Sequence, residues 1–292
     1  MITKIHFSSF ICMFFLCINP LLLFTTTQAE ELDIINRPIN TLGLTGLLFT
    51  TEPYTLPKGT VEVGTAILNE SSDIPNFTIN EFPIMIAVGL PKNSELALKT
   101  TYFYIKEPPT TSNSNNYQRK TGDAELSYKW NFFTQPKDSI LPAIALILTG
   151  IAPTNNYQDE VINGVNHWGM RMGLSAGTEI NWQDYIIGVY ADGQAQGQDL
   201  TQKYIRDFYG ILNAGLLFPV SKYRNLQMFA EYTLVFGTDQ ITLEGGDYNG
   251  LTIGVRLVSE RFNLTVGDQF LYKQAQGYTN SSRLIALLSM KL

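Results

Sequence analysis

The residues in this chain that could carry out chemistry are few. Outside its first 29 residues the chain has one histidine, His167, and no cysteine. This composition excludes thiol catalysis and disulfides, and it excludes the histidine and cysteine sets that usually bind zinc. Two acidic groups could bind calcium weakly, although a solvated surface is the expected role of each. They are Asp239, Glu244 and Asp247, and the pair Asp192 and Asp199. We therefore expect no bound metal and no cofactor.

His167 is the one histidine that could act as a catalytic base. Such a base needs a nucleophile within hydrogen-bond reach. Outer-membrane lipases and deacylases are similar in placing a serine two residues after the histidine, so that both side chains point the same way on a strand. The corresponding residue here is Gly169. The sequence predicts that His167 lies at the end of a strand and that the chain is not an enzyme, with an outer-membrane lipid hydrolase as an alternative.

Charged residues that alternate with apolar ones form a second candidate group. Both signs occur, on at least eight predicted strands. Inside a closed barrel they could line a pore and filter solutes by charge and size. They could equally form a salt-bridge network that braces a small barrel. The predicted pore-lining residues are Glu125, Lys129, Arg171, Glu179, Glu231, Arg256, Lys273 and Arg283, and the same inward face includes Glu62, Lys99 and Lys291.

The elements that position these charges are segments of about 10 to 13 residues in which apolar and polar residues alternate. Such alternation is typical of outer-membrane strands, whose apolar side chains face lipid while polar ones face the lumen. In residues 122–133, Leu126 and Trp130 fall on one face and Glu125 and Lys129 on the other. Twelve strands are predicted: 60–69, 79–90, 95–106, 122–133, 140–152, 168–180, 184–195, 204–217, 226–236, 251–258, 262–274 and 283–292.

The connections between these strands alternate in length. Five short turns lie at 91–94, 134–139, 181–184, 219–224 and 259–261. Six longer polar loops lie at 70–78, 107–121, 153–167, 196–203, 237–250 and 275–282. Bacterial barrels combine short periplasmic turns with longer external loops and an even number of strands. The pattern therefore indicates a twelve-stranded barrel with both termini in the periplasm.

Composition and the N-terminus support this assignment. Only 16% of residues are charged, against about 25% in soluble domains, and after the N-terminus no run of about 20 apolar residues could form a membrane helix. Residues 1–29 resemble a signal peptide, with Lys4, an apolar stretch over 7–24 and a small-residue site after which cleavage is expected, at Ala29. The formal charge of −6 argues against nucleic acid as a partner.

Residues 30–59 do not fit the strand pattern. They contain an apolar run at 42–49 followed by Pro53 and Pro57. The segment could enter the lumen as a partial plug or lie as an extended arm at the periplasmic rim. The inward face of strand 140–152 is itself apolar, and an apolar partner inside the barrel would explain it, which favours the plug slightly. That face consists of Leu141, Ala143, Ala145, Ile147 and Ile151.

Several short stretches resemble the outer-membrane transporter family named for the MetA pathway of phenol degradation. They are Thr55-Leu56-Pro57-Lys58-Gly59, Gly122-Asp123 before Ala-Glu-Leu-Ser-Tyr-Lys-Trp, Leu141-Pro142-Ala143 leading to Ala152-Pro153-Thr154, and Met228-Phe229-Ala230-Glu231-Tyr232. The chain departs from the family at Asn155, where a glycine is expected. The resemblance implies a channel for small solutes, apolar or aromatic ones included.

Together these features predict an all-β protein of the Gram-negative outer membrane. Its expected parts are a signal peptide at 1–29, a periplasmic extension or partial plug at 30–59, and an antiparallel transmembrane β-barrel at 60–292. The expected function is passive passage of small solutes, with the lipid bilayer and the solute as partners. A lipid hydrolase and a non-conducting structural or assembly barrel remain as alternatives.

Overall fold

The computed structural model describes ten stretches of the chain. They are residues 37–73, 76–106, 117–137, 139–154, 168–182, 185–198, 208–220, 225–237, 247–273 and 281–292. The chain divides into two compact units, Met1–Glu31 and Leu32–Leu292, and every described residue belongs to the second. No helix within these stretches is long and apolar enough to cross a membrane.

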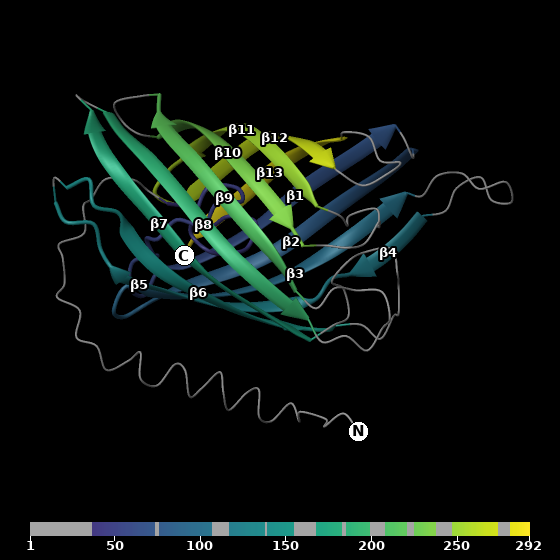
Figure 1. The fold of residues 1–292 in the computed structure, drawn as a ribbon, viewed down its shortest axis with the longest axis horizontal. Coiled ribbons are helices and arrows are strands. Elements are labelled where there is room, and N and C mark those ends of the chain that lie inside the picture. The colour runs from purple at the N-terminus through teal and green to yellow at the C-terminus, as the bar shows by residue number, and fades with distance from the viewer. Residues whose placement is uncertain are drawn as a thin grey trace, which may run out of the picture. The chain divides into compact units, whose positions relative to one another are not determined.

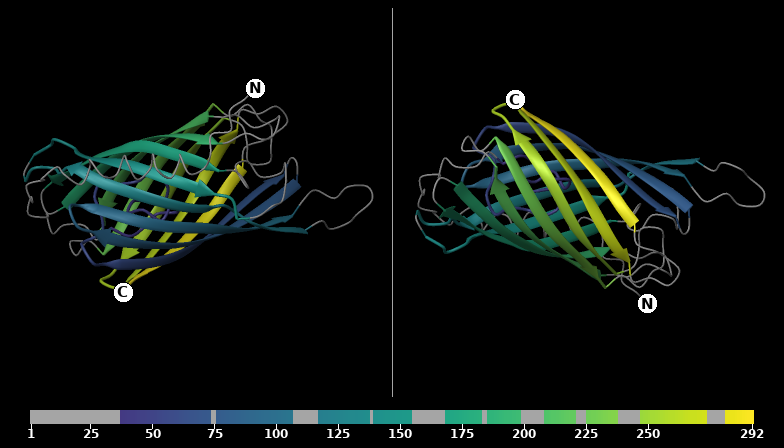
Figure 2. Two further views of the ribbon diagram at one scale, coloured as in Figure 1. Left: turned by 90° about the horizontal axis from the view of Figure 1, so that it is seen from below. Right: turned by 90° about the horizontal axis from the view of Figure 1, so that it is seen from above.

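The elements of regular structure in the described part of the second unit are all β-strands (Figure 1). In chain order they are β1 (Val61–Asp73), β2 (Asn76–Leu90), β3 (Ser94–Lys106), β4 (Tyr117–Thr121), β5 (Ala124–Phe133), β6 (Ala143–Ala152), β7 (Gly169–Trp182), β8 (Tyr185–Gln198), β9 (Phe208–Pro219), β10 (Leu226–Phe236), β11 (Tyr248–Val258), β12 (Phe262–Lys273) and β13 (Ser281–Lys291). Strands that follow one another pair antiparallel, except that β4 and β5 each pair with β3, and β13 pairs with β1, which closes the sheet. Figure 2 shows the strands running obliquely around the closed barrel, as closure requires.

Strands β4 and β5 together fill one position of the barrel, because both pair with β3. Thr121 of β4 pairs with Tyr102, and Glu125 of β5 pairs with Lys99. Four residue steps along β4 and β5 thus match three along β3, so one extra residue is accommodated between them as a bulge. The barrel therefore has twelve strand positions, and the predicted twelve-stranded antiparallel barrel is confirmed.

The predicted alternation is observed directly in the burial of side chains. On β11, Thr252 and Arg256 are completely buried, whereas Ile253 and Val255 are 50% and 46% exposed. The exposed apolar side chains form the outer surface, and the buried polar ones face the lumen. Apolar side chains outside and polar side chains inside are the reverse of the arrangement in soluble proteins, and they are expected of a barrel surrounded by lipid.

Some predicted loops are wrong in their bounds. The stretch 70–78 was expected to be a longer loop, yet β1 and β2 continue through most of it, with Ser71 paired to Thr78 and Asp73 to Asn76. β4 likewise lies within the predicted loop 107–121. Residues 69–73 contain no apolar side chain. A strand that extends beyond the apolar band needs no lipid-facing residues, so its alternation is invisible in the sequence.

The lipid-facing surface predicts a depth-dependent mutational effect. Replacing Ile253, near the middle of β11, by arginine should destabilise the barrel by about 2–4 kcal/mol, because a charge is placed in hydrocarbon. Leu257→Arg, near the end of the same strand and equally exposed, should cost about 0–1 kcal/mol. Equilibrium unfolding in lipid vesicles measures both. Equal losses at the two positions would contradict the assigned depth.

Candidate functional site

The barrel encloses a stretch of its own chain, residues Arg37–Leu56, which we call the inner segment. None of its side chains is exposed, and Leu44, Leu47, Leu48 and Glu52 are at most 1% exposed. Two isolated bridges, Ile39 to Thr45 and Gly46 to Thr51, fold it back on itself. Backbone hydrogen bonds within the segment, such as Asn40 N–H to Leu44 and Glu52 N–H to Thr45, satisfy part of its polar groups. The other buried polar groups need partners elsewhere.

Carboxylates of the barrel wall accept hydrogen bonds from the backbone of the inner segment. Glu231 on β10 accepts the N–H groups of Leu48, Phe49 and Thr50 at 3.1, 3.0 and 2.6 Å. Asp192 on β8 accepts the N–H of Thr51 at 2.8 Å. Three successive N–H groups on one carboxylate form a dense, charge-assisted anchor.

Glu95 on β3 provides a second anchor. It accepts the N–H of Thr45 at 2.8 Å and that of Leu56 at 2.9 Å. These two residues lie eleven positions apart, Thr45 in the middle of the segment and Leu56 at its end. One carboxylate therefore fixes both the middle and the C-terminal end of the inner segment.

Wall cations and amides donate to the carbonyl groups of the same segment. Lys129 on β5 donates to the carbonyl oxygens of Thr45 and Glu52 at 3.1 and 3.0 Å. Arg256 on β11 donates to Gly46 at 3.0 Å, and Asn131 on β5 donates to Pro53 at 3.0 Å. The wall thus recognises the main chain of the inner segment on both its donor and its acceptor sides.

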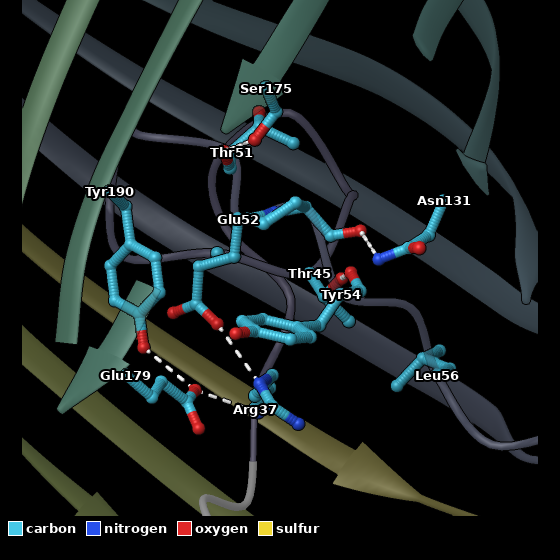
Figure 3. Close-up of polar contacts among 12 residues, drawn as sticks. Arg37, Thr45, Thr51, Glu52, Tyr54, Leu56, Asn131, Ser175, Glu179 and Tyr190 are labelled. Carbon is cyan, nitrogen blue, oxygen red and sulfur yellow. Dashed lines mark hydrogen bonds and ion pairs between the residues drawn. The ribbon is translucent and has the colours of Figure 1, made fainter. Parts of the chain in front are cut away.

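Arg37 holds the N-terminal end of the inner segment (Figure 3). Its Nη2 lies 2.7 Å from Glu179 Oε1, and its Nε lies 3.4 Å from Glu52 Oε2. Its guanidinium carbon lies 4.0 Å from the centre of the Tyr54 ring, and the Tyr190 hydroxyl donates to Glu179 at 3.0 Å. Burial lowers the pKa of Arg37, but Glu179 and Glu52 outweigh it and leave the pKa raised. Arg37 therefore stays charged inside the barrel.

Glu52 is the acidic residue at the centre of this group. Both its carboxylate oxygens lack a hydrogen-bond partner, and Arg256 Nη2 lies 3.8 Å away. Burial raises the pKa of Glu52, and Arg256 and Arg37 oppose that rise. The position of Glu52 is thus stabilised by charge rather than by direct hydrogen bonds.

Apolar contacts complete the packing of the inner segment. Leu44, Leu47 and Leu48 belong to one buried cluster with wall residues that include Ile147 and Phe229. At Gly215 on β9 a Cβ atom would lie 2.5 Å from Leu47 Cδ1, so glycine at this position lets Leu47 pack close to the wall. Ile147, on the apolar inward face of β6, is the residue of that face that belongs to this cluster. Leu141 was expected on that face, but it precedes β6 and is 55% exposed, so this assignment is wrong.

The other half of the lumen, nearer the longer connections, has no such filling among the described residues. Its wall carries Lys99 bonded to Glu125 at 2.9 Å, and Arg171 bonded to the same carboxylate. Where β13 closes the barrel against β1, Arg283 on β13 contacts Glu70 at 2.7 Å and Glu81 at 3.5 Å. We call these six residues the charged wall. Their side chains are mostly 7–18% exposed, whereas Lys129, Glu95 and Arg256 are fully buried. Solvent therefore reaches this level of the lumen and stops at the inner segment.

Seven of the eight predicted pore-lining residues separate into two groups at different depths. Lys129, Glu179, Glu231 and Arg256 contact the inner segment. Glu125, Arg171 and Arg283 form ion pairs within the wall. The side chain of Lys273, at the end of β12, lies outside the described residues.

Sequence reasoning missed several residues of the lumen. Glu95 and Glu81 have the inward parity of their predicted strands, so the alternation could have identified them. Asp192 was expected to be solvated but is 4% exposed and bonded to Thr51. Arg37 and Glu52 lie in a stretch without periodicity, where no sequence pattern marks them.

Most residues of the candidate catalytic and calcium sites lie outside the described part of the chain. His167 lies outside the described residues, and Gly169 is the first residue of β7. Asp199, Asp239 and Glu244 also lie outside them. Within the described part of the chain, no group of three or more histidine, cysteine or acidic side chains could hold a metal ion.

Comparison with known proteins identifies the architecture but no family. No protein-family model and no curated protein matches the chain. Among solved structures, LpxR from Salmonella typhimurium has a TM-score of 0.50 at 11% identity, covering 78% of this chain and 99% of its own. The transport unit of the autotransporter AIDA-I from Escherichia coli also has a TM-score of 0.50 at 11% identity, covering 84% and 93%. The monoaromatic hydrocarbon channel CymD reaches 0.42 at 8% identity, covering 90% and 98%. The neighbours are outer-membrane barrels, and at these identities the likeness is one of fold alone.

Proposed function

We propose that the protein is an outer-membrane channel for passive passage of small solutes, and that the inner segment closes one half of its lumen. The observation that carries this proposal is the division of the lumen into two levels. One level is fully buried around the inner segment, and the other is lined by ion pairs that solvent reaches.

The width of the barrel supports a channel over a purely structural role. An eight-stranded barrel is filled by its own side chains, whereas 16-stranded porins enclose an aqueous channel. A barrel with twelve positions lies between these limits. Here part of the extra space holds Arg37–Leu56, bound mainly through polar contacts to the wall. A barrel needed only as a brace would not require a lumen wide enough for a separate segment.

The decisive experiment is reconstitution of the purified mature protein. In planar bilayers or liposomes it should pass ions and small solutes above the background of bare lipid. Liposomes without protein and liposomes with heat-denatured protein are the controls. A correctly folded preparation with no conductance and no solute entry would refute the proposed function.

Charge reversal at the charged wall predicts a change in ion selectivity. Arg171→Glu should shift the channel towards cations, because Arg171 lies at the solvent-reached level beside Glu125. The reversal potential in a salt gradient measures this shift. Arg261→Glu, an equal charge change on an exposed residue between β11 and β12, is the control and should leave selectivity unchanged. An unshifted potential for Arg171→Glu would show that this residue does not line the ion path.

We also propose that residues 1–29 are removed as a signal peptide. The proposal rests on the apolar stretch 7–24 and the small residue Ala29. Intact-mass measurement of protein extracted from outer membranes should give a chain that begins at Glu30. A mass that retains residues 1–29 would refute it.

A further inference from the structure

Five consecutive strands carry uncharged polar side chains on the lumen face. Gln194 on β8, Asn213 on β9, Thr233 on β10, Thr252 on β11 and Gln269 on β12 are each at most 5% exposed. The register places Asn213 beside Thr233 and Thr252 beside Gln269. We call these five residues the neutral belt.

Each residue of the neutral belt has an oxygen atom without a hydrogen-bond partner. Leaving one buried polar atom unpaired is unfavourable, and five such atoms on adjacent strands are unusual in a native protein. The unpaired atoms are Gln194 Oε1, Asn213 Oδ1, Thr233 Oγ1, Thr252 Oγ1 and Gln269 Oε1. Oxygen atoms of this kind can accept hydrogen bonds from a bound molecule that carries donors.

The orientation of two of the amides is fixed by Asp192. Gln194 donates its Nε2 to Asp192 Oδ1 at 2.7 Å, and Asn213 donates its Nδ2 to both oxygens of Asp192 at 3.2 Å. A carboxylate only accepts, so the amide nitrogens must point towards it and the amide oxygens away. The belt therefore presents acceptors, and the two threonine hydroxyls can also accept.

The neutral belt lies directly beside the inner segment. Asn213 Nδ2 also lies 3.4 Å from the carbonyl oxygen of Phe49, and Asp192 accepts the N–H of Thr51. A solute that enters from the solvent-reached half would meet the belt where the inner segment closes the lumen.

The charged wall occupies the other part of the same ring. Gln269 is in register with Arg283, and Gln196, two residues after Gln194, accepts from Arg171 at 3.3 Å. The charged wall contains three cations, Lys99, Arg171 and Arg283, and three carboxylates, Glu70, Glu81 and Glu125. Their formal charges cancel, so the charged wall has no net charge with which to prefer an ion. The remaining carboxylate beside the belt, Asp192, is buried and covered by its hydrogen bonds to Gln194, Asn213 and Thr51.

We propose that the neutral belt is the solute-binding site of the channel and that its solute is small, uncharged and rich in hydroxyl groups, like a sugar. The proposal rests on the channel function proposed above. Hydroxyl groups supply the donors that the unpaired oxygens lack, whereas an apolar solute would leave those oxygens unpaired and desolvated. This solute class differs from the apolar or aromatic one that the sequence resemblance implies.

Block of the ion current by added solutes tests this proposal. Purified mature protein in a planar bilayer would be titrated separately with glucose, maltose, gluconate and toluene. Glucose or maltose should reduce the current in a saturable manner, and gluconate and toluene should not. The double variant Thr233→Val/Thr252→Val removes two hydroxyls at nearly constant volume. It should weaken the block at least threefold per hydroxyl, or about tenfold in total.

The matched control is Thr149→Val. Thr149 also faces the lumen, but its hydroxyl is already hydrogen-bonded to Ser127 at 2.9 Å. Block by sugar should be unchanged in this variant. Normal ion current without any sugar block, equal block by toluene, or unchanged block in the double variant would each overturn the solute assignment and leave the channel intact. Absence of ion current would instead refute the channel.

Discussion

Deleting residues 37–56 is expected to raise the single-channel conductance severalfold. The inner segment fills the level of the lumen at which Lys129, Glu95 and Arg256 are completely buried. Without it, those side chains would line a continuous aqueous path that joins the solvent-reached half to the opposite end of the barrel. Single-channel recording of the mature chain and of the deletion variant measures the difference.

A point variant tests the same claim without shortening the chain. Glu231 accepts three successive backbone N–H groups of the inner segment. Glu231→Ala leaves those donors unpaired in a buried site, so the bound position of the segment should lose several kcal/mol. We expect brief transitions to the conductance level of the deletion variant. Thr149→Ala, on β6 with its hydroxyl bonded to Ser127 and not to the inner segment, serves as the control and should not open. Conductance unchanged in both the deletion and Glu231→Ala would show that the inner segment does not obstruct the path.

The barrel itself could be predicted because its signal is local. Each lipid-facing residue is selected by its own contact with hydrocarbon, so alternation along a single strand suffices to identify it. Thr252, Ile253 and Arg256 on β11 follow the predicted faces without exception. The rule fails where strands leave the apolar band, as at residues 69–73. There the strand continues, but the sequence no longer alternates between apolar and polar residues.

The inner segment could be predicted only as one of two alternatives because its contacts are distant and directed at the backbone. Arg37 and Glu179 are 142 positions apart, and Leu48 and Glu231 are 183 apart. Glu231, Glu95 and Lys129 bind mainly main-chain groups, and the Thr45 hydroxyl is a side-chain partner of Glu95 and Lys129. A backbone contact leaves no requirement on side-chain type in the segment that is bound. Only the apolar inward face of β6 gave an indirect indication that a partner lies inside.

The sequence also could not predict how deeply each charged side chain is buried in the lumen. Lys99 and Lys129 have the same inward parity and equivalent partners on neighbouring strands. Lys99 on β3 faces Glu125 on β5, and Lys129 on β5 faces Glu95 on β3. Their environments differ because the inner segment covers only the second pair.

These two ion pairs therefore provide a matched comparison for stability. In Lys129→Met, the Glu95 carboxylate loses its cation at 3.0 Å, and the carbonyls of Thr45 and Glu52 lose their donor. Removing one partner of a fully buried pair typically costs about 3–5 kcal/mol. In Lys99→Met, Glu125 retains Arg171 and both partners are 14% exposed. The expected loss there is about 1 kcal/mol or less.

Unfolding of each variant in lipid vesicles measures this difference, and a second substitution identifies its cause. Glu95→Gln in the Lys129→Met background removes the uncompensated charge and keeps an amide oxygen that can accept the N–H of Thr45 or Leu56. If the loss arises from a buried unpaired carboxylate, the double variant should recover a substantial part of it, because neutral replacement of both partners is far less costly than removal of one. If instead the two lysine variants were equally stable, Lys129 would be as hydrated as Lys99. The division of the lumen into a closed and a solvent-reached level would then be wrong.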